Sequence, residues 1–142
     1  VIGRKTLKNS TFDGNGHKIS GINSNGTQTK LFDDIYVSEI KDLEIECKEK
    51  EDGRGLGVYL ADSTIDSKFT NCSITGNRIE IDGYCSAMIR EAYASEFIHC
   101  INNADIIYNN DTQIVAGLVC EAENCILINV KIMEILLPRR HM

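Results

Sequence analysis

The sequence predicts an all-β fold, a right-handed single-stranded parallel β-helix (a solenoid) of about five coils, and three observations point to it. Apolar residues recur with a period of 28–30 residues, and periods of this size are typical of solenoids. Within each repeat, apolar and polar residues alternate as they do in β-strands. Gly, Asn, Asp and Ser separate the alternating stretches and supply turns.

The repeat is measured from four apolar anchor residues that stand 28, 29 and 30 residues apart: Phe32, Leu60, Ile89 and Val119. After Val119, apolar residues follow 8, 11 and 13 positions later. The same offsets describe the units at Phe32 and Ile89, except that Asn102 breaks the pattern in the second of these. After Leu60 the pattern is shifted by one residue, as if one residue were inserted. The core positions predicted in this way are Ile40, Leu43 and Ile45; Phe69, Cys72 and Ile74; Phe97 and Cys100; and Leu127, Val130 and Ile132.

The chain is expected to form one domain over residues 1–142, because its length suits a single domain. Residues 1–10 are predicted to be an N-terminal lead-in or cap, residues 11–132 the coils, and residues 133–142 a C-terminal cap or tail. A single coil cannot bury its apolar face alone, so the stacking of coils forms the core. Neighbouring strands lie about 4.8 Å apart, and five coils would therefore give a body about 24 Å tall.

A tight turn is predicted at Asp13–Gly16, because Gly and Asn tolerate positive φ. His17 follows this turn, and we interpret it as a turn residue rather than as a metal ligand or catalytic group. The charged run KEKEDGR at residues 48–54 is interpreted as a solvated loop that projects from the solenoid.

Three segments resemble bacterial surface β-helix proteins that carry GLUG-type repeats. They are TFDGNGHKISGIN at residues 11–23, LFDDIYVSEIKDLEI at residues 31–45 and AGLVCEAENCILINVKI at residues 116–132. The first two resemble the opening turn and strands of such proteins. The third is similar to the repeat itself, with Cys120 where a small residue is usual. The resemblance implies an adhesin-like module, extracellular or on the bacterial cell surface, and it brings no catalytic residues.

The composition narrows the range of partners. A formal net charge of -6 argues against nucleic acid and against an anionic membrane as general partners. No apolar run approaches the length that spans a bilayer, so we expect no membrane insertion. Hydrophobic residues make up 42% of the chain, with no Trp, which suffices for a thin core of stacked aliphatic and Phe side chains.

Six cysteines are many for a chain of 142 residues. The repeat places Cys72 and Cys100 in one core column, so we expect two buried, reduced thiols that pack as small hydrophobes. A disulfide network among the six cysteines is the alternative. The spacing of Cys120 and Cys125 is not typical of a metal site, and no metal site is predicted there.

The repeat also aligns four carboxylates, two residues after the anchors: Asp34, Asp62, Glu91 and Glu121. Stacked like charges about 5 Å apart are unfavourable unless water or cations screen them. We therefore favour side chains that splay into solvent. Two functional alternatives remain: a cation ladder, whose oxygen ligands suit Ca²⁺, or an acid–base pair, Asp62 and Glu91, for polysaccharide cleavage. Apart from Ca²⁺ in the first alternative, no cofactor is expected.

A second column of polar residues immediately precedes one of the core columns: Asp42, Asn71, His99 and Asn129. Stacked Asn side chains hydrogen-bond along a solenoid, and this is the role we predict for Asn71 and Asn129. His99 is interpreted as a surface residue that fills an Asn position, with pH sensing as the alternative.

The segment at residues 132–137, IMEILL, is apolar and follows the last complete repeat. The strand edges at the end of a solenoid invite pairing with another chain. We expect this segment either to cover the last coil or to pack against a second copy of the chain, which would make a homo-oligomer through the coil ends.

The expected function is that of a non-catalytic β-helix module, either a stalk or a ligand-binding domain for a host surface or a polysaccharide. The alternative is a carbohydrate-active β-helix enzyme of the lyase or hydrolase kind, or the remnant of one, that uses stacked surface carboxylates. Such enzymes have many more coils and long loops that build a cleft, and this chain has little room for either.

Overall fold

The computed structural model of the protein describes residues 5–20, 29–47, 58–76, 78–81, 84–86, 88–103, 105–108, 114–116, 118–132 and 135–136. All regular structure in these residues is β-strand, and every pairing between the strands is parallel. They contain no helix long and apolar enough to cross a membrane. The all-β, all-parallel arrangement agrees with the fold class expected from the repeats and is compatible with a solenoid.

A five-stranded sheet takes one strand from each repeat, in the order β1-β4-β6-β10-β15. Each of these strands pairs with the equivalent strand 28–30 residues farther along the chain. We call the five strands, each with the segment after it, units 1 to 5. The strands are β1 (Thr6–Lys8), β4 (Thr29–Tyr36), β6 (Val58–Ile65), β10 (Ile89–Tyr93) and β15 (Val119–Glu123).

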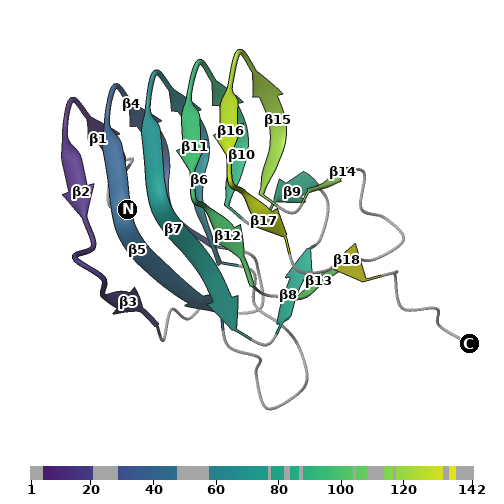
Figure 1. Ribbon diagram of the computed structural model, residues 1–142. Coiled ribbons are helices and arrows are strands. Elements are labelled where there is room, and N and C mark those ends of the chain that lie inside the picture. The colour runs from purple at the N-terminus through teal and green to yellow at the C-terminus, as the bar shows by residue number, and fades with distance from the viewer. Residues whose placement is uncertain are drawn as a thin grey trace, which may run out of the picture.

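An eight-stranded sheet lies beside the first and is built from the next segments of the same units. In Figure 1 the bends that join the two sheets line up along one edge, from β1–β2 to β15–β16. The strands of this sheet are β2 (Thr11–Asp13), β3 (Lys18–Ile19), β5 (Glu39–Cys47), β7 (Lys68–Gly76), β11 (Glu96–Ile98), β12 (Ile101–Asn102), β16 (Ile126–Ile128) and β17 (Lys131–Ile132).

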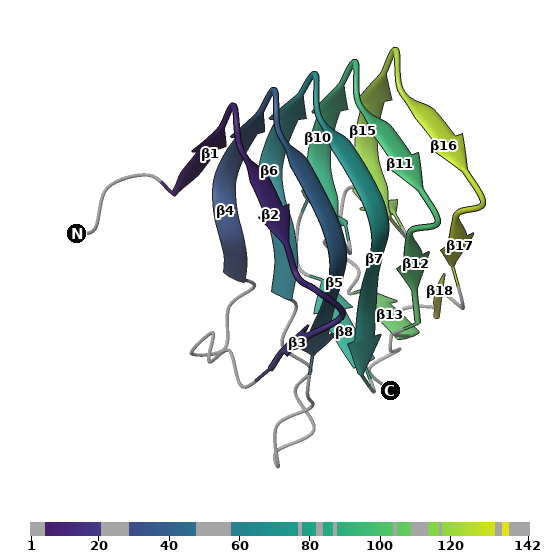
Figure 2. The same cartoon turned by 60° about the vertical axis from the view of Figure 1, so that its left-hand side comes forward.

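Two small sheets continue units 3 to 5, and Figure 2 shows part of them below the larger sheets. One has the order β18-β13-β8, and the other pairs β14 with β9. Their strands are β8 (Arg78–Ile81), β9 (Tyr84–Ser86), β13 (Asp105–Tyr108), β14 (Ile114–Ala116) and β18 (Ile135–Leu136). The charged run at residues 48–54 lies outside the described residues.

The repeats begin earlier and continue later than the boundaries expected at residues 11 and 132. Thr6–Lys8 already pairs with unit 2 in the register that the later units keep. At the other end, Ile135–Leu136 pairs in parallel with β13, so this part of the predicted cap or tail belongs to a sheet. Residues 1–4 and 137–142 lie outside the described residues, as do the side chains of the segment IMEILL.

The register corrects one of the four anchors. Phe32, Ile89 and Val119 lie in one row, but the residue that completes the row is Ala61 and not Leu60. Measured from Ala61, the core positions of this unit fall at the usual offsets, and no inserted residue is needed. The error has a physical cause, because Leu60 and Ala61 are both buried, so the alternation fails at this point and the larger side chain looks like the anchor.

The core consists of rows of side chains that repeat from unit to unit. One row of the eight-stranded sheet runs Phe12, Ile40, Phe69, Phe97 and Leu127. Phe69 and Phe97 stack with ring centroids 4.8 Å apart and an interplanar angle of 6°, a separation close to the spacing of neighbouring strands. Phe12 meets Phe32 edge-on at 5.8 Å. Ile40, Phe69 and Phe97 are each fully buried.

Asn102 keeps its place in the repeat although its side chain is polar. It pairs with Ile74 on one side and Ile132 on the other, and it is fully buried. The sequence pattern is therefore interrupted at this position, whereas the backbone register is not.

The turn at Asp13–Gly16 forms as predicted and packs closely against unit 2. Gly16 has a φ of 76°, and Asn15 has one of 51°. A Cβ atom at Gly14 would collide with the carbonyl oxygen of Asp42, and this close approach requires glycine. His17 is exposed and donates its backbone N–H to the Gly14 carbonyl, as expected of a turn residue.

Candidate functional site

The edge between the two large sheets, which we call the first corner, has the same construction in each unit. One residue per unit adopts the left-handed conformation, with φ between 47° and 54°, and the next residue is small and polar. The left-handed residues are Asn9, Val37, Asp66, Ala94 and Asn124. The residues after them are Ser10, Ser38, Ser67, Ser95 and Cys125.

These small residues form a hydrogen-bonded ladder. The Ser67 hydroxyl donates to the Ile65 carbonyl at 2.9 Å, and the same bond to the carbonyl two residues earlier recurs at the other members. Between units, the backbone N–H of Ser38 donates to Ser67 Oγ, and that of Ser67 donates to Ser95 Oγ, both at 3.2 Å. The hydroxyls therefore accept backbone N–H groups that the bend removes from the sheet ladder. In units 2 to 5, the carbonyls to which they donate also accept a backbone N–H, as Ile65 does from Val37.

Sequence reasoning missed the first corner, although a signal was present. The serines recur at intervals of 28, 29 and 28 residues, in step with the anchors. The residues before them concealed the pattern, because Val37 and Ala94 are not residue types that favour positive φ.

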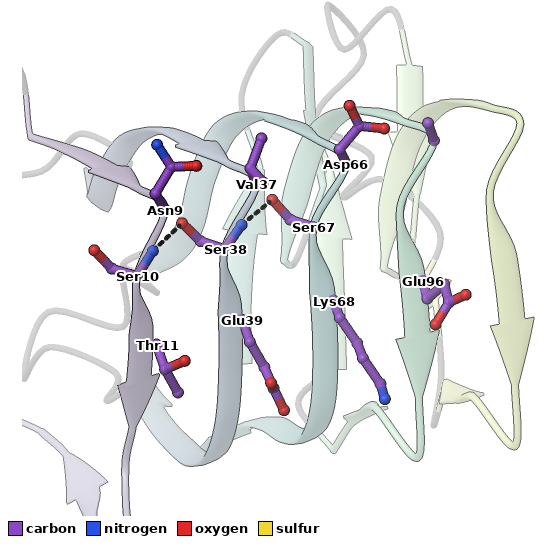
Figure 3. A pocket seen from close by; sticks show the side chains of 11 residues that line it. Asn9, Ser10, Thr11, Val37, Ser38, Glu39, Asp66, Ser67, Lys68 and Glu96 are labelled. Atoms are coloured by element: carbon purple, nitrogen blue, oxygen red, sulfur yellow. Dashed lines mark hydrogen bonds between the residues drawn. The ribbon is translucent and has the colours of Figure 1, made fainter.

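A shallow groove of about 700 Å³ runs along the outside of the first corner across units 1 to 4. Figure 3 shows its lower side, where Glu39, Lys68 and Glu96 project from neighbouring strands, and its upper side, where Asp66 stands at the bend. The register places Lys68 between the two glutamates. Alternating charges of this kind are favourable neighbours on a sheet, so the groove offers charged and hydroxyl-bearing groups to a polar ligand.

The carboxylate row expected from the repeat is only partly correct. Asp34, Glu91 and Glu121 share one row, but Ser63 stands where Asp62 was predicted. The cause is the shift of the anchor from Leu60 to Ala61. Ser63 donates a hydrogen bond to Asp34 at 3.1 Å. Asp34 is buried, so the expectation that its side chain splays into solvent is wrong.

Asp62 forms part of a different group. Its carboxylate is paired with the Lys30 ammonium, and Lys30 also lies 3.0 Å from the carboxylate of Asp33. The residue opposite Glu91 in unit 3 is Ser63, so the register does not bring Asp62 and Glu91 together as directly opposed neighbours. The acid–base pair was predicted from that alignment.

Acidic side chains do gather on β10 and β15, the last two strands of the five-stranded sheet. Glu91 and Glu121 are directly paired residues. Together with Glu123 they raise the pKa of the Tyr93 hydroxyl, with Glu91 contributing most. Within the described residues, no group of three or more His, Cys, Asp or Glu side chains is placed to hold a metal ion.

The polar column at the second corner, inside the eight-stranded sheet, is brought together as predicted. Asp42, Asn71, His99 and Asn129 all have φ between 51° and 53°. Asn71 donates its side-chain amide to the Asp42 carboxylate at 2.8 Å. Asn, Asp and His are the non-glycine residues that most often adopt this conformation, so the column sets the backbone direction at the bend.

The core column next to it also agrees with the prediction for its cysteines. Cys72 and Cys100 are buried free thiols, and each Sγ donates to the carbonyl two residues earlier, at 3.5 and 3.7 Å. A hydrogen bond with Cys100 and burial both raise the pKa of the Cys72 thiol. Cys120 and Cys125 are also free, and the side chains of Cys47 and Cys85 lie outside the described residues.

Comparison of the chain with protein-family models, with curated proteins and with solved structures found no match. The candidate site therefore depends on the geometry of this chain. That geometry supplies one continuous outer groove with mixed charges and an ordered internal ladder beneath it.

Proposed function

We propose that the chain is a right-handed parallel β-helix of about five coils that serves as a non-catalytic module of a bacterial cell-surface or secreted protein. The observation that carries this proposal is the unbroken register at the first corner, where equivalent residues follow one another through every unit. Such a stack keeps its units at fixed positions relative to one another along its axis, because backbone pairing and the hydroxyl ladder join neighbouring units. A stalk or display scaffold needs this property.

The arrangement of the acids supports a non-catalytic role better than a glycosidase-like one. A pair of carboxylic acids must flank the bond that is cleaved. Asp62 is engaged with Lys30, and its expected partner Glu91 faces Ser63 instead. Two of the three acidic residues of the groove, Glu39 and Glu96, stand on either side of Lys68, and the third, Asp66, stands at the bend.

The groove at the first corner is the surface where a ligand would bind, and its chemistry suits a polysaccharide. Sugar hydroxyls both donate and accept hydrogen bonds, and the groove presents a cation, carboxylates and the hydroxyl of Thr11. The corner beneath the groove has the same backbone conformation in each unit, and a polysaccharide likewise repeats its sugar units. A stalk with such a groove combines the two roles expected from the sequence.

The test is incubation of the purified chain with a panel of polysaccharides, with binding and released reducing ends measured in parallel. At a concentration where the chain is monomeric, we expect retention on at least one polysaccharide, weakened by Lys68→Glu and unchanged by Lys131→Glu, a matched charge reversal outside the groove. We expect no reducing ends. Release of reducing ends that disappears in Asp62→Asn would contradict the non-catalytic proposal, and absence of any retention would leave the stalk without the ligand-binding role.

A further inference from the structure

The last unit of the stack differs from the others in the residues that its edge strands expose. β15, β16 and β17 each stand at the edge of their sheet, and β16 exposes all three of its side chains. Ile126, Leu127 and Ile128 are 51%, 49% and 46% exposed. In the row of Ile126, units 1 to 4 carry Thr11, Glu39, Lys68 and Glu96. The last unit thus has isoleucine where units 1 to 4 have a polar residue. This isoleucine lies on an edge strand, whose backbone N–H and C=O groups are not paired with another strand on one side.

A strand that is apolar on both faces is typical of a strand buried on both faces, and an exposed apolar edge promotes pairing with another chain. We propose that this C-terminal edge binds the N-terminal edge of a second copy of the chain, head to tail, so that β1 and β2 of one copy pair with β15 and β16 of the other. The inference rests on the proposed β-helix, but it does not depend on whether the module binds sugars.

The internal rows of the two edges match residue by residue. If the register of the stack continues, Phe12 of the second copy lies beside Leu127, in the row that contains Phe69 and Phe97. Leu7 likewise lies beside Ala122, in the row of Ile35. Phe12 and Leu7 are only partly buried within one chain. Both rows would therefore extend their apolar contacts across the junction.

The hydroxyl ladder also continues. In each internal junction that shows the bond, the backbone N–H of the earlier unit donates to the side chain of the later one, as Ser10 does to Ser38 at 3.2 Å. Ser10 is exposed in a single chain. At the junction, Ser10 of the second copy would become the later unit, and its hydroxyl would accept the N–H of Cys125.

The charges of the two edges complement one another. Lys8 of the second copy would occupy the row of Glu123, because Lys8, Tyr36, Ile65, Tyr93 and Glu123 follow one another in register. Two rows oppose the junction: Lys18 would lie beside Lys131, and the Asp13 carboxylate would lie beside Ile128.

The interface is heterologous: the two contacting surfaces differ, so a pair of copies still has one free edge of each kind. Such contacts form open-ended assemblies unless a rotation closes them into a ring. The proposal thus commits to linear growth, which distinguishes it from a two-fold dimer that stops at two copies.

The test is sedimentation velocity of the whole chain over a wide range of concentrations. We expect species larger than a dimer that increase with concentration. Lys8→Glu and Glu123→Lys should each raise the dissociation constant about tenfold, because each turns an attractive pair into a repulsive one. The double variant should recover association, and so should a mixture of the two single variants. Lys68→Glu, which makes the same change in net charge as Lys8→Glu but away from the ends, should associate as the unaltered chain does.

Lys131→Glu gives the opposite outcome, because it removes the like-charge row and should tighten association several-fold. Far-UV circular dichroism and the melting temperature of each variant show whether it folds. A folded chain that remains monomeric at all concentrations would overturn the stacking while leaving the β-helix module in place. Loss of association in the double variant as large as in either single variant would also overturn it. A spectrum dominated by helix would instead refute the proposed module.

Discussion

The two corners of each unit have the same backbone geometry and different side-chain chemistry. At both, a residue with φ near 50° precedes an inward-facing residue. The first corner fills the inward position with Ser10, Ser38, Ser67, Ser95 and Cys125, whereas the second fills it with Leu43, Cys72, Cys100 and Val130. Hydroxyls at the first corner bond backbone groups of two units. At the second corner, apolar side chains and thiols occupy the same row.

This difference shows that a left-handed bend does not by itself determine the type of the next residue. Cysteine can serve at either corner, because its thiol is a weak donor and otherwise packs as a small hydrophobe. Cys125 donates to the carbonyl of Glu123 as the serines do to theirs, and Cys72 donates to that of Thr70. Serine and leucine are specific to one corner each, and substitutions that exchange polar and apolar side chains test the comparison.

The largest effect is expected at the first corner. Ser67→Val removes the hydroxyl that accepts the Ser38 N–H and places a larger side chain in a closely packed row. We expect the free energy of unfolding to fall by about 3 kcal/mol, from the unsatisfied buried N–H and from overpacking. Urea denaturation measures the loss. Ser67→Cys is the matched control and should lose clearly less, since Cys125 occupies the same row.

Asn71→Val should have the next largest effect. It breaks the hydrogen bond between Asn71 and Asp42 and forces a β-branched residue to a φ of 53°. Together these changes should destabilise the protein by about 2 kcal/mol. Asn71→Asp, which tolerates positive φ but places a second carboxylate beside Asp42, should fall between the unaltered chain and Asn71→Val. An unfolding midpoint unchanged in Asn71→Val would show that the column does not set the bend.

Val37→Asn is the converse substitution at the first corner, and it should stabilise the protein. Val37 is 55% exposed, so little apolar burial is lost, and its φ of 47° is unfavourable for valine. We expect a gain of about 1 kcal/mol in the free energy of unfolding. Ala94→Asn, at the equivalent position of unit 4, should give a smaller gain in the same assay. A loss of stability in both would mean that the bend is strained for another reason.

The smallest effect is expected for Cys72→Val, the counterpart of Ser67→Val at the second corner. Leu43 is the directly paired neighbour of Cys72, so the row already accepts a branched apolar side chain, and the thiol forms only weak hydrogen bonds. The free energy of unfolding should change by no more than about 1 kcal/mol. If Cys72→Val costs as much as Ser67→Val, the two corners do not differ in the way described.

Much of this arrangement could be predicted from the sequence because side-chain type and period carry it. The strands with clear alternation, such as the one that contains Leu43 and Ile45, pair in the predicted register. The column of Asp42 and Asn71 could be predicted because those residue types favour positive φ.

The errors arose where side-chain type and backbone geometry disagree. Two consecutive buried residues, Leu60 and Ala61, moved the anchor by one position, and this moved Asp62 into a row that contains Ser63. Val37 hid the first corner, because valine gives no sign of a left-handed bend. In a strand, a one-residue shift transfers a side chain to the opposite face, so a correct expectation of parallel β-strands still gave a wrong partner for Glu91.

The constant spacing of the pairings has a consequence for how the molecule gains and loses order. Every paired residue in the two large sheets finds its partner 26–30 residues away, so no step of folding has to close a loop much longer than one unit. Order can spread from a central unit to its neighbours. Units 1 and 5 pair on one side only within the large sheets, and their amide hydrogens should exchange with solvent before those of β7 and β10.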